Sequence, residues 1–231
     1  AYPEYITVEQ AADNMPLGKG TKKEPYLIST FDHLMWMSLN LVEDSPYNWH
    51  SIHYQLANDI DAKASHAIEG GFPGIPYYNS RVPFYGSFNG KGYAIKNFLS
   101  TTGLFTKTEE KARIDSLALV NVSVQGSEIG GLVGISNEGT VNACYATGMV
   151  IGLGSSLITK TNEGTISDCY AVANIVGPSS AIMHSGENVE RCYVVAKTLP
   201  GFQWVFNEGG NQNVNGYYNS DIFQQTASPS P

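Results

Sequence analysis

The pair Cys-Tyr recurs three times at nearly equal spacing in the second half of the chain. The copies are Cys144-Tyr145, Cys169-Tyr170 and Cys192-Tyr193, which lie 25 and 23 residues apart. The first two copies also share their context, because Asn-Glu-Gly-Thr precedes both and Ala follows both. Self-similarity at a period of this length is typical of stacked-repeat architectures.

An apolar residue stands three positions before each cysteine and extends the repeat in both directions. These positions are Ile95, Ile114, Val141, Ile166, Val189 and Val214. Three residues further along stand Phe98, Leu117, Cys144, Cys169, Cys192 and Tyr217. Because large apolar residues share the slot, we predict that the cysteines form a reduced, inward-facing ladder. A disulfide between cysteines of adjacent rungs is the alternative, since the strand spacing falls within the Cα range of a disulfide.

The local pattern favours strands over helices in these repeats. Residues 120–124 alternate apolar and polar with period two and are rich in β-branched side chains. The 24 glycines suit a chain that turns often, and no long run of helix formers follows residue 45. We therefore predict an all-β chain that forms a parallel β-helix of about six rungs, each of about 20 to 28 residues. The glycine of each Asn-Glu-Gly turn is expected at positive φ.

Three regions are expected along the chain. Residues 1–83 form an N-terminal cap, with a helix over about 30–42 that covers the first rung, a first strand over 54–61 and a long loop over 62–83. Residues 84–223 form the β-helix repeats. Residues 224–231 are a polar tail or linker rich in Pro and Ser, which suggests a larger multidomain chain.

Charge and hydropathy exclude several classes of partner. The net charge is −8 and only 15% of the residues are charged, which argues against nucleic acid. No apolar stretch reaches the length of a membrane span, so membrane insertion is not expected. No cofactor or metal site is expected, because the cysteines lie in one column and the pair His50/His53 lacks a third ligand.

Residues 130–150 resemble the GLUG-motif repeat family of bacterial surface and secreted proteins. They read Gly-Gly-Leu-Val-Gly-Ile-Ser-Asn-Glu-Gly-Thr-Val-Asn-Ala-Cys-Tyr-Ala-Thr-Gly-Met-Val. Residues 156–176 keep the turn and Cys-Tyr-Ala but lose the paired glycines. The resemblance implies a right-handed parallel β-helix, an extracellular or cell-surface location, and a role as a module of an adhesin or a surface protease. It implies no active site, since the motif consists of structural residues.

Outward-facing tyrosines are the candidate binding residues. If Cys144 points inward, its neighbour Tyr145 points outward. Tyr145, Tyr170, Tyr193 and Tyr218 are therefore expected to form an aromatic column, and Tyr77 and Tyr78 add further rings in the loop over 62–83. Such a column can bind a glycan or a protein surface. Alternatively, the rings stabilise one another as cross-strand pairs.

Acidic residues give two further candidate sites. Asp59 and Asp61, with Glu69 and Arg81 nearby in the sequence, are the best catalytic candidates, as in a carbohydrate-active enzyme built on a β-helix. Glu138, Glu163 and Glu187 fall at one turn and could bind calcium or form a carboxylate pair, although a solvated turn explains them as well.

We expect a non-enzymatic extracellular module of a bacterial surface protein, which serves adhesion by binding a glycan or a host or neighbouring-cell surface protein. One alternative is a polysaccharide lyase or hydrolase. The other is a purely structural stalk or spacer.

Overall fold

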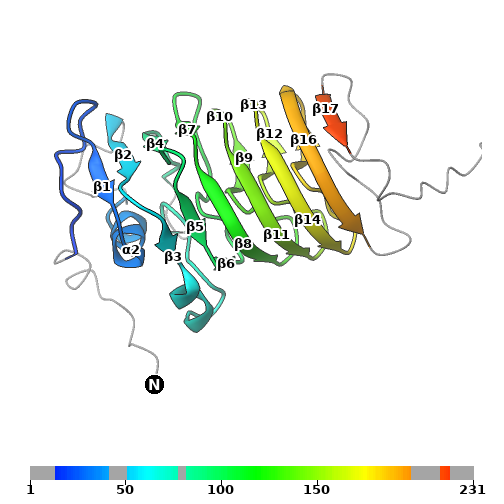
Figure 1. The fold of residues 1–231 in the computed structure, drawn as a ribbon, viewed down its shortest axis with the longest axis horizontal. Coiled ribbons are helices and arrows are strands. Elements are labelled where there is room, and N and C mark those ends of the chain that lie inside the picture. The colour runs from blue at the N-terminus through cyan, green and yellow to red at the C-terminus, as the bar shows by residue number, and fades with distance from the viewer. Residues whose placement is uncertain (1–13, 42–50, 78–81, 199–213, 219–231) are drawn as a thin grey trace, which may run out of the picture.

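The chain coils into a parallel β-solenoid of about six turns (Figure 1). The computed structural model describes residues 14–41, 51–77, 82–198 and the backbone of 214–218. Within the described residues the strands pair with one another in parallel, for example β10 with β13, so the predicted all-β parallel solenoid is confirmed. The buried side chains of all turns merge into one continuous apolar core along the axis.

Two sheets wrap this core. The larger sheet has the order β1-β2-β4-β7-β10-β13-β16-β14-β11-β8-β5-β3, in which β17 pairs with β16 and β6 with β8. Its strands are β1 (Tyr26–Ile28), β2 (His53–Leu56), β3 (Ile60–Asp61), β4 (Ser87–Asn89), β5 (Ala94–Lys96), β6 (Leu99–Ser100), β7 (Arg113–Asp115), β8 (Ala118–Gln125), β10 (Thr140–Asn142), β11 (Tyr145–Ile151), β13 (Thr165–Ser167), β14 (Tyr170–Val176), β16 (Val189–Thr198) and β17 (Val214–Tyr218). The smaller sheet contains β9 (Val133–Asn137), β12 (Thr159–Asn162) and β15 (Met183–Gly186).

The pairing of the first strand of each turn follows the predicted frame in five repeats. Val141 pairs with Ile114 and Ile166, Ile166 pairs with Val189, and Val189 pairs with Val214. The prediction for Ile95 is wrong. Phe88 is the residue that pairs with Ile114, whereas Ile95 pairs with Leu119 on another side of the solenoid.

The α-helix α2 (Phe31–Asn40) follows β1. Thr30 caps it, because its side-chain oxygen accepts a hydrogen bond from the backbone N–H of His33 at 3.2 Å. The Trp36 ring packs edge-on against Tyr26 with ring centroids 5.3 Å apart, which joins the helix to the solenoid core. The helix matches the predicted range closely, while its role as a cap stays a prediction.

The outer edge of β1 is paired by an antiparallel segment that precedes it. The backbone N–H of Leu27 donates to the carbonyl of Leu17 at 2.7 Å, and the N–H of His53 donates to Gly20 at 2.8 Å. An open edge would offer unpaired backbone groups to other strands. The described part of the first turn therefore contains a backbone cover that the sequence pattern did not predict.

Residues 53–83 also differ from the predicted layout. The first strand is β1, and the range 54–61 holds two short strands, β2 and β3. The predicted loop contains the 3-10 helix η2 (Lys63–Ala67) and buries large apolar side chains completely, among them Phe72 and Ile75. The large sheet runs across residue 83, since β2 before it pairs with β4 after it.

The Asn-Glu-Gly turns are held by a buried polar ladder. Asn137 Nδ2 donates to Asn162 Oδ1 at 2.7 Å, and Thr108 Oγ1 donates to Asn137 Oδ1 at 2.7 Å. The prediction of positive φ at the glycines of these turns is wrong, because neither Gly139 nor Gly164 has one. These positions require glycine because the backbones of stacked turns approach closely there.

Candidate binding face

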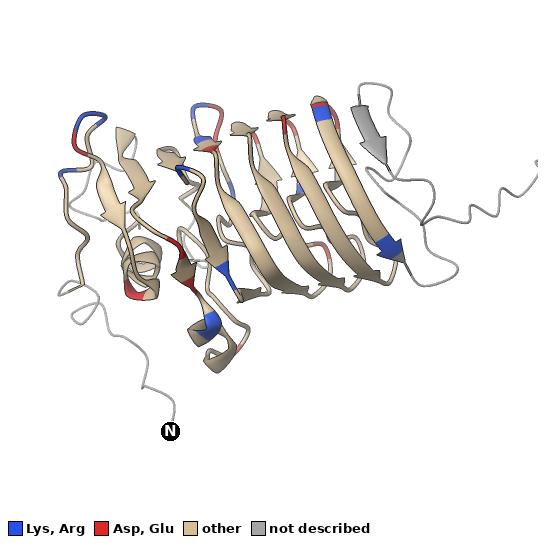
Figure 2. Cartoon of the chain, viewed as in Figure 1, with Lys and Arg blue, Asp and Glu red and all other residues tan. Residues whose placement is uncertain are grey.

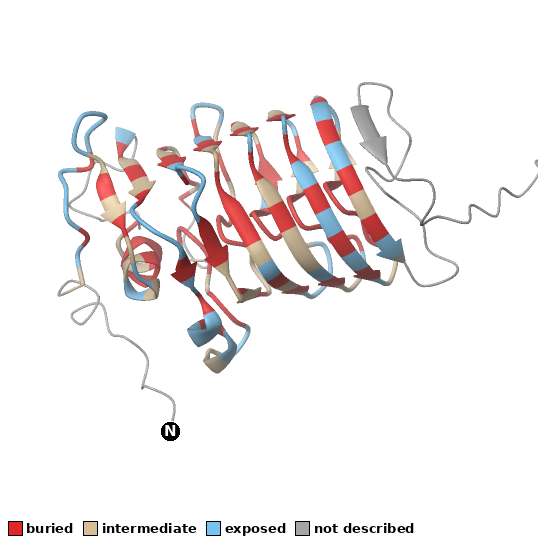
Figure 3. Cartoon of the chain, viewed as in Figure 1, coloured by how far each residue is buried: buried red, intermediate tan, exposed pale blue. Residues whose placement is uncertain are grey.

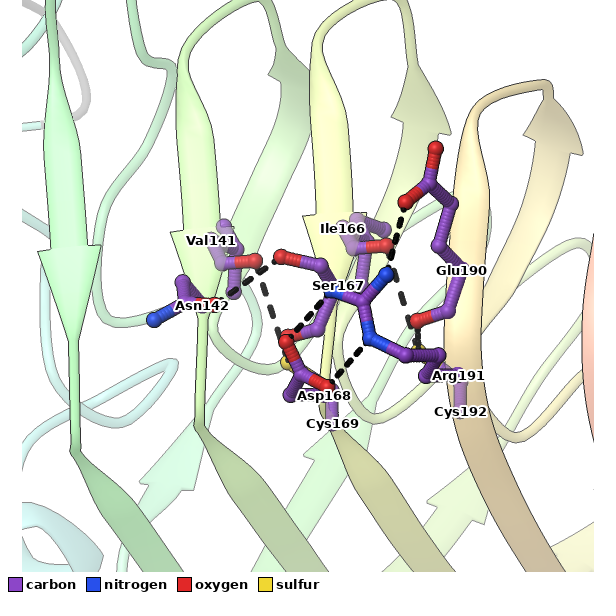
Figure 4. A network of polar contacts seen from close by, with 9 residues as sticks. All are labelled: Val141, Asn142, Ile166, Ser167, Asp168, Cys169, Glu190, Arg191 and Cys192. Atoms are coloured by element: carbon purple, nitrogen blue, oxygen red, sulfur yellow. Dashed lines mark hydrogen bonds and ion pairs between the residues drawn. The ribbon is translucent and has the colours of Figure 1, made fainter.

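Each Cys-Tyr pair lies just past a corner of the solenoid. One residue in the left-handed backbone conformation forms each of these corners. Ala143, Asp168 and Arg191 have φ of 51°, 54° and 50°, respectively. This conformation turns the chain between β10 and β11 and between β13 and β14. Asp168 and Arg191 stack at the corner, where Arg191 Nε and Nη2 each donate to one Asp168 carboxylate oxygen at 2.7 Å (Figure 4).

The three cysteines point inward and are free, as the ladder interpretation predicted. Cys144, Cys169 and Cys192 are at most 2% exposed, and each thiol lies near backbone carbonyl oxygens. Figure 4 shows this for Cys169 and Cys192. The interaction with the Cys144 side chain and burial raise the pKa of Cys169, and the interaction with the Cys169 side chain and burial raise the pKa of Cys192. Both thiols therefore stay protonated at neutral pH, which suits packing rather than chemistry.

We expect the native protein to resist thiol reagents. Because all three thiols are buried, and those of Cys169 and Cys192 are also kept protonated, a disulfide-exchange reagent at neutral pH should label none of the three cysteines until denaturant is added. The variant Tyr170→Cys supplies an exposed thiol as a positive control and should label at once. Rapid labelling of Cys169 or Cys192 in the folded wild type would contradict the inert ladder.

The tyrosines that follow the cysteines point outward in one row. Tyr145, Tyr170 and Tyr193 are paired in register on β11, β14 and β16. The Tyr145 and Tyr170 rings stack with centroids 4.6 Å apart and planes 5° from parallel. Tyr170 is 39% exposed and Tyr193 is 42% exposed. The faces of the stacked pair cover each other, so the pair presents mainly ring edges and hydroxyl groups to a ligand.

The other predicted tyrosines lie elsewhere. Tyr193 pairs with Tyr217, and Tyr218 pairs with Val194, so the expectation that Tyr218 continues the row is wrong by one residue. Tyr77 lies beside α2, where its backbone N–H donates to the carbonyl of Ser38 at 3.0 Å. Tyr78 falls outside the described residues.

The tyrosine row is one edge of a larger exposed surface that the sequence analysis missed. We call the outward-pointing residues of β11, of β14 and of β16 from Tyr193 onward the outer face, which leaves out Glu190 and Arg191 at the corner. They are Tyr145, Thr147, Met149, Ile151, Tyr170, Val172, Asn174, Val176, Tyr193, Val195 and Lys197. Strand β14 alternates strictly between exposed and buried residues (Figure 3). This alternation is legible in the sequence and could have identified the whole surface.

The outer face carries almost no charge. Lys197 is its one charged residue, and it lies at the end of β16 (Figure 2). Val172, Val176 and Met149 are each more than a third exposed, which is unusual for neighbouring large apolar side chains on a parallel sheet. The geometry gives a flat surface with one charged residue and with aromatic, aliphatic and amide groups.

The candidate catalytic carboxylates are held by separate structural contacts. Asp59 forms an ion pair with Lys96 at 2.6 Å and accepts a hydrogen bond from the backbone N–H of Ala94 at 2.9 Å. Asp61 accepts hydrogen bonds from Asn97 Nδ2 at 2.9 Å and from the backbone N–H of Lys63 at 3.0 Å. These bonds lower the pKa of both carboxyl groups, with Lys96 and Asn97 as the largest causes. Both are therefore ionised at neutral pH and unsuited to the role of general acid.

The predicted glutamate column follows the buried asparagine ladder at the turns. Asn137 pairs with Asn162, which pairs with Gly186, so Glu138, Glu163 and Glu187 stand at equivalent positions. Glu138 is engaged in an ion pair with Lys107 at 2.8 Å. Glu163 and Glu187 are exposed, as expected for a solvated turn.

Histidines and carboxylates do not gather in the part of the chain that the structure describes. No group of three or more His, Cys, Asp or Glu side chains there is placed to hold a metal ion. His53 Nδ1 makes a hydrogen bond with Ser87 Oγ at 2.5 Å, and His50 lies outside the described residues. Among the described helices, none has the length and apolar character needed to span a membrane.

Two curated relatives match part of the chain in sequence. Halomucin of Haloquadratum walsbyi is 35% identical over 138 residues, which cover 57% of this chain and 1% of Halomucin. A protein of Evansella cellulosilytica, named provisionally as a Gly-rich membrane protein, is 32% identical over 155 residues, which cover 61% of this chain and 17% of the relative. The chain thus spans a small fraction of both relatives.

A solved structure shares the fold. It belongs to a protein of Bacteroides ovatus that is provisionally described as an immunoglobulin A1 protease. The TM-score is 0.58 at 22% identity, over 78% of this chain and 61% of the neighbour, which supports the β-solenoid. No family model matches the chain, so the resemblance to GLUG repeats is not confirmed.

Proposed function

We propose that this chain is a non-enzymatic, partner-binding module of a larger extracellular or cell-surface protein. The observation that carries the proposal is the outer face, which leaves large apolar and aromatic side chains partly exposed on a rigid sheet with one charged residue. Contiguous exposed apolar surface of this kind marks interaction sites on soluble domains. The partner is a glycan or a surface protein of a host or neighbouring cell, and the binding serves adhesion.

The relatives support the location. The names Halomucin and Gly-rich membrane protein both point to proteins of the cell exterior or envelope, and the chain matches only a segment of each. A module that is repeated along a long surface protein would match only a short segment of that protein. The GLUG-type repeat, a right-handed coil and a capping role for α2 belong to the same proposal.

The candidate active-site residues support a binding role over catalysis. Asp59 and Asp61 are held in separate contacts that favour their ionised forms, and the tyrosine row lies on different strands. A glycosidase pair needs one carboxyl group that stays protonated near neutral pH. The outer face needs no such group, because its contacts are those of packing and hydrogen bonding.

Alanine substitution in the tyrosine row tests this function. Tyr170→Ala and Tyr193→Ala should each weaken binding to a glycan array or to intact cells about tenfold or more, because each removes a large, partly exposed ring from the face. Tyr93→Ala is the matched control, since Tyr93 is 40% exposed and lies outside the outer face. Binding that all three variants retain equally would remove the outer face from consideration.

A further inference from the structure

We infer that the ligand of the outer face is a neutral polysaccharide chain that lies along the axis of the solenoid. This inference rests on the proposed binding function and narrows it to one chemical class. Three properties of the described residues support it. They are the low charge of the face, the regular spacing of its side chains and its mixture of aromatic, aliphatic and amide groups.

The charge of the face selects against ionic ligands. The residues of the face include no Asp or Glu, and Lys197 stands at one end of β16. Glu190 and Arg191 precede the face at the other end of β16, where they form an ion pair with each other at 3.0 Å. Acidic polysaccharides and nucleic acids are bound through clustered Arg and Lys, and cationic partners through carboxylates. The outer face offers neither cluster, so a ligand without charge complements it best.

The periodicity of the face matches a polymer that is itself periodic. Tyr145, Tyr170 and Tyr193 form one row, and Thr147, Val172 and Val195 form the next. Within a row, equivalent positions repeat at the strand spacing of about 4.8 Å along the solenoid. A chain of linked sugar rings laid along a row meets a similar group on every rung, and several weak contacts then add on one ligand.

The mixture of groups suits sugar rings better than a dry protein core. Asn174 lies between Met149 and Lys197 in a third row, and its exposed amide can exchange hydrogen bonds with hydroxyl groups. The valines of the second row can pack against the C–H surfaces of the same rings. A protein partner with an apolar core would have to desolvate Asn174 and the tyrosine hydroxyls, which costs free energy unless each finds a partner.

The flatness of the face also favours a polysaccharide over a protein partner. Tyr193, at 42%, is the most exposed of its large apolar and aromatic side chains, so no single anchor projects from the described part. Protein interfaces usually depend on a few anchors that enter pockets. An extended sugar chain needs no pocket, because it spreads its contacts over many rings.

Binding to defined polysaccharides tests the inference. The folded chain should be mixed with insoluble cellulose, chitin and β-1,3-glucan, and with the acidic polymers polygalacturonate and alginate. We expect retention on at least one neutral polymer, with an affinity that added salt changes little. Val172→Lys should weaken this binding about tenfold or more, because it places a flexible charge at the centre of the face.

Thr140→Lys provides the matched control. It adds the same charge at a partly exposed outward position on β10, outside the outer face, and should bind like the wild type. Circular dichroism and thermal unfolding establish that both variants are folded. Tyr170→Ala gives a second loss of binding without any new charge.

Several results would overturn the inference. Binding confined to acidic polymers, or abolished by salt, would show an ionic ligand. Self-association of the wild type that Val172→Lys abolishes would show that a second copy occupies the face. Cell binding that depends on Val172 and survives glycosidases but not proteases would identify a protein partner, which overturns this inference and leaves the proposed function intact. Neutral-polymer binding unaffected by Val172→Lys and Tyr170→Ala would overturn both.

Discussion

The substitution Gly164→Ala is expected to be among the most destabilising single changes in this chain. A Cβ atom built at Gly164 overlaps the backbone carbonyl oxygen of Gly139 in the turn below, and it also crowds the carbonyl of Glu138. Both groups that obstruct the Cβ are backbone carbonyls of the neighbouring turn, so no side-chain rotation relieves the overlap. The stacked turns must separate, and this strains the neighbouring hydrogen bonds from the N–H groups of Gly164 to Asn137 and of Thr165 to Gly139.

The expected loss is about 3 kcal/mol or more, at the upper end of overpacking effects. For a chain of this size, such a loss lowers the melting temperature by about 6 to 12 °C, measurable by circular dichroism or calorimetry. Gly92→Ala is the control. Gly92 has φ of 82° but no heavy atom within 4 Å of an added Cβ, so this variant bears only the backbone strain of about 1 to 2 kcal/mol. Equal losses in the two variants would show that close approach of the turns does not matter.

The sequence was sufficient to predict the fold and the inward ladder because the same physical constraint repeats. Cys144 and Leu117 occupy equivalent inward positions, so one register explains both. The alternation of buried and exposed residues in β11 and β14 has the period of a strand. Repetition of this kind makes the register of the central turns predictable from the apolar residues alone.

The predicted register is wrong at the places where the corners of the solenoid change length. Asn89 pairs with Asp115 and Ala94 pairs with Ala118, so the corner after β4 is two residues longer than the corner after β7. Because of this longer corner, no large apolar residue stands three positions after Phe88, whereas Ile95 and Phe98 have the same spacing as Ile114 and Leu117 and were selected in its place. The same effect at the far end, where the pairing shifts by one residue between Glu190 and Cys192, puts Tyr217 in place of Tyr218.

The candidate site was only half predictable for a related reason. Tyr145, Tyr170 and Tyr193 were found because each follows a cysteine in a recognisable motif. Val172, Val195 and Asn174 belong to no motif, and their common exposure depends on the absence of any described element packed over β14. Alternation predicts which residues point outward, but it does not tell whether another part of the chain covers them.

The second large effect is expected at Asn137, which is fully buried and joins two rungs. Its Nδ2 donates to Asn162 Oδ1 at 2.7 Å and to the Gly139 carbonyl at 3.2 Å, and its Oδ1 accepts from Thr108 Oγ1 at 2.7 Å. Asn137→Ala leaves these three partners buried without the bonds that Asn137 made. Each loss costs about 1 to 3 kcal/mol, so we expect destabilisation of about 3 to 5 kcal/mol.

Asn174→Ala is the matched control for this change, because Asn174 is an exposed asparagine on β14 and its loss should alter stability by less than about 0.5 kcal/mol. A double-mutant cycle with Thr108→Val separates the ladder from simple loss of volume. If the Thr108 and Asn137 side chains act through their mutual bond, the double variant should be more stable than the sum of the single losses predicts, by about 1 kcal/mol. Strict additivity would mean that the two side chains act independently, and the buried ladder would then be a by-product of the repeat and not one of the interactions that hold its turns in register.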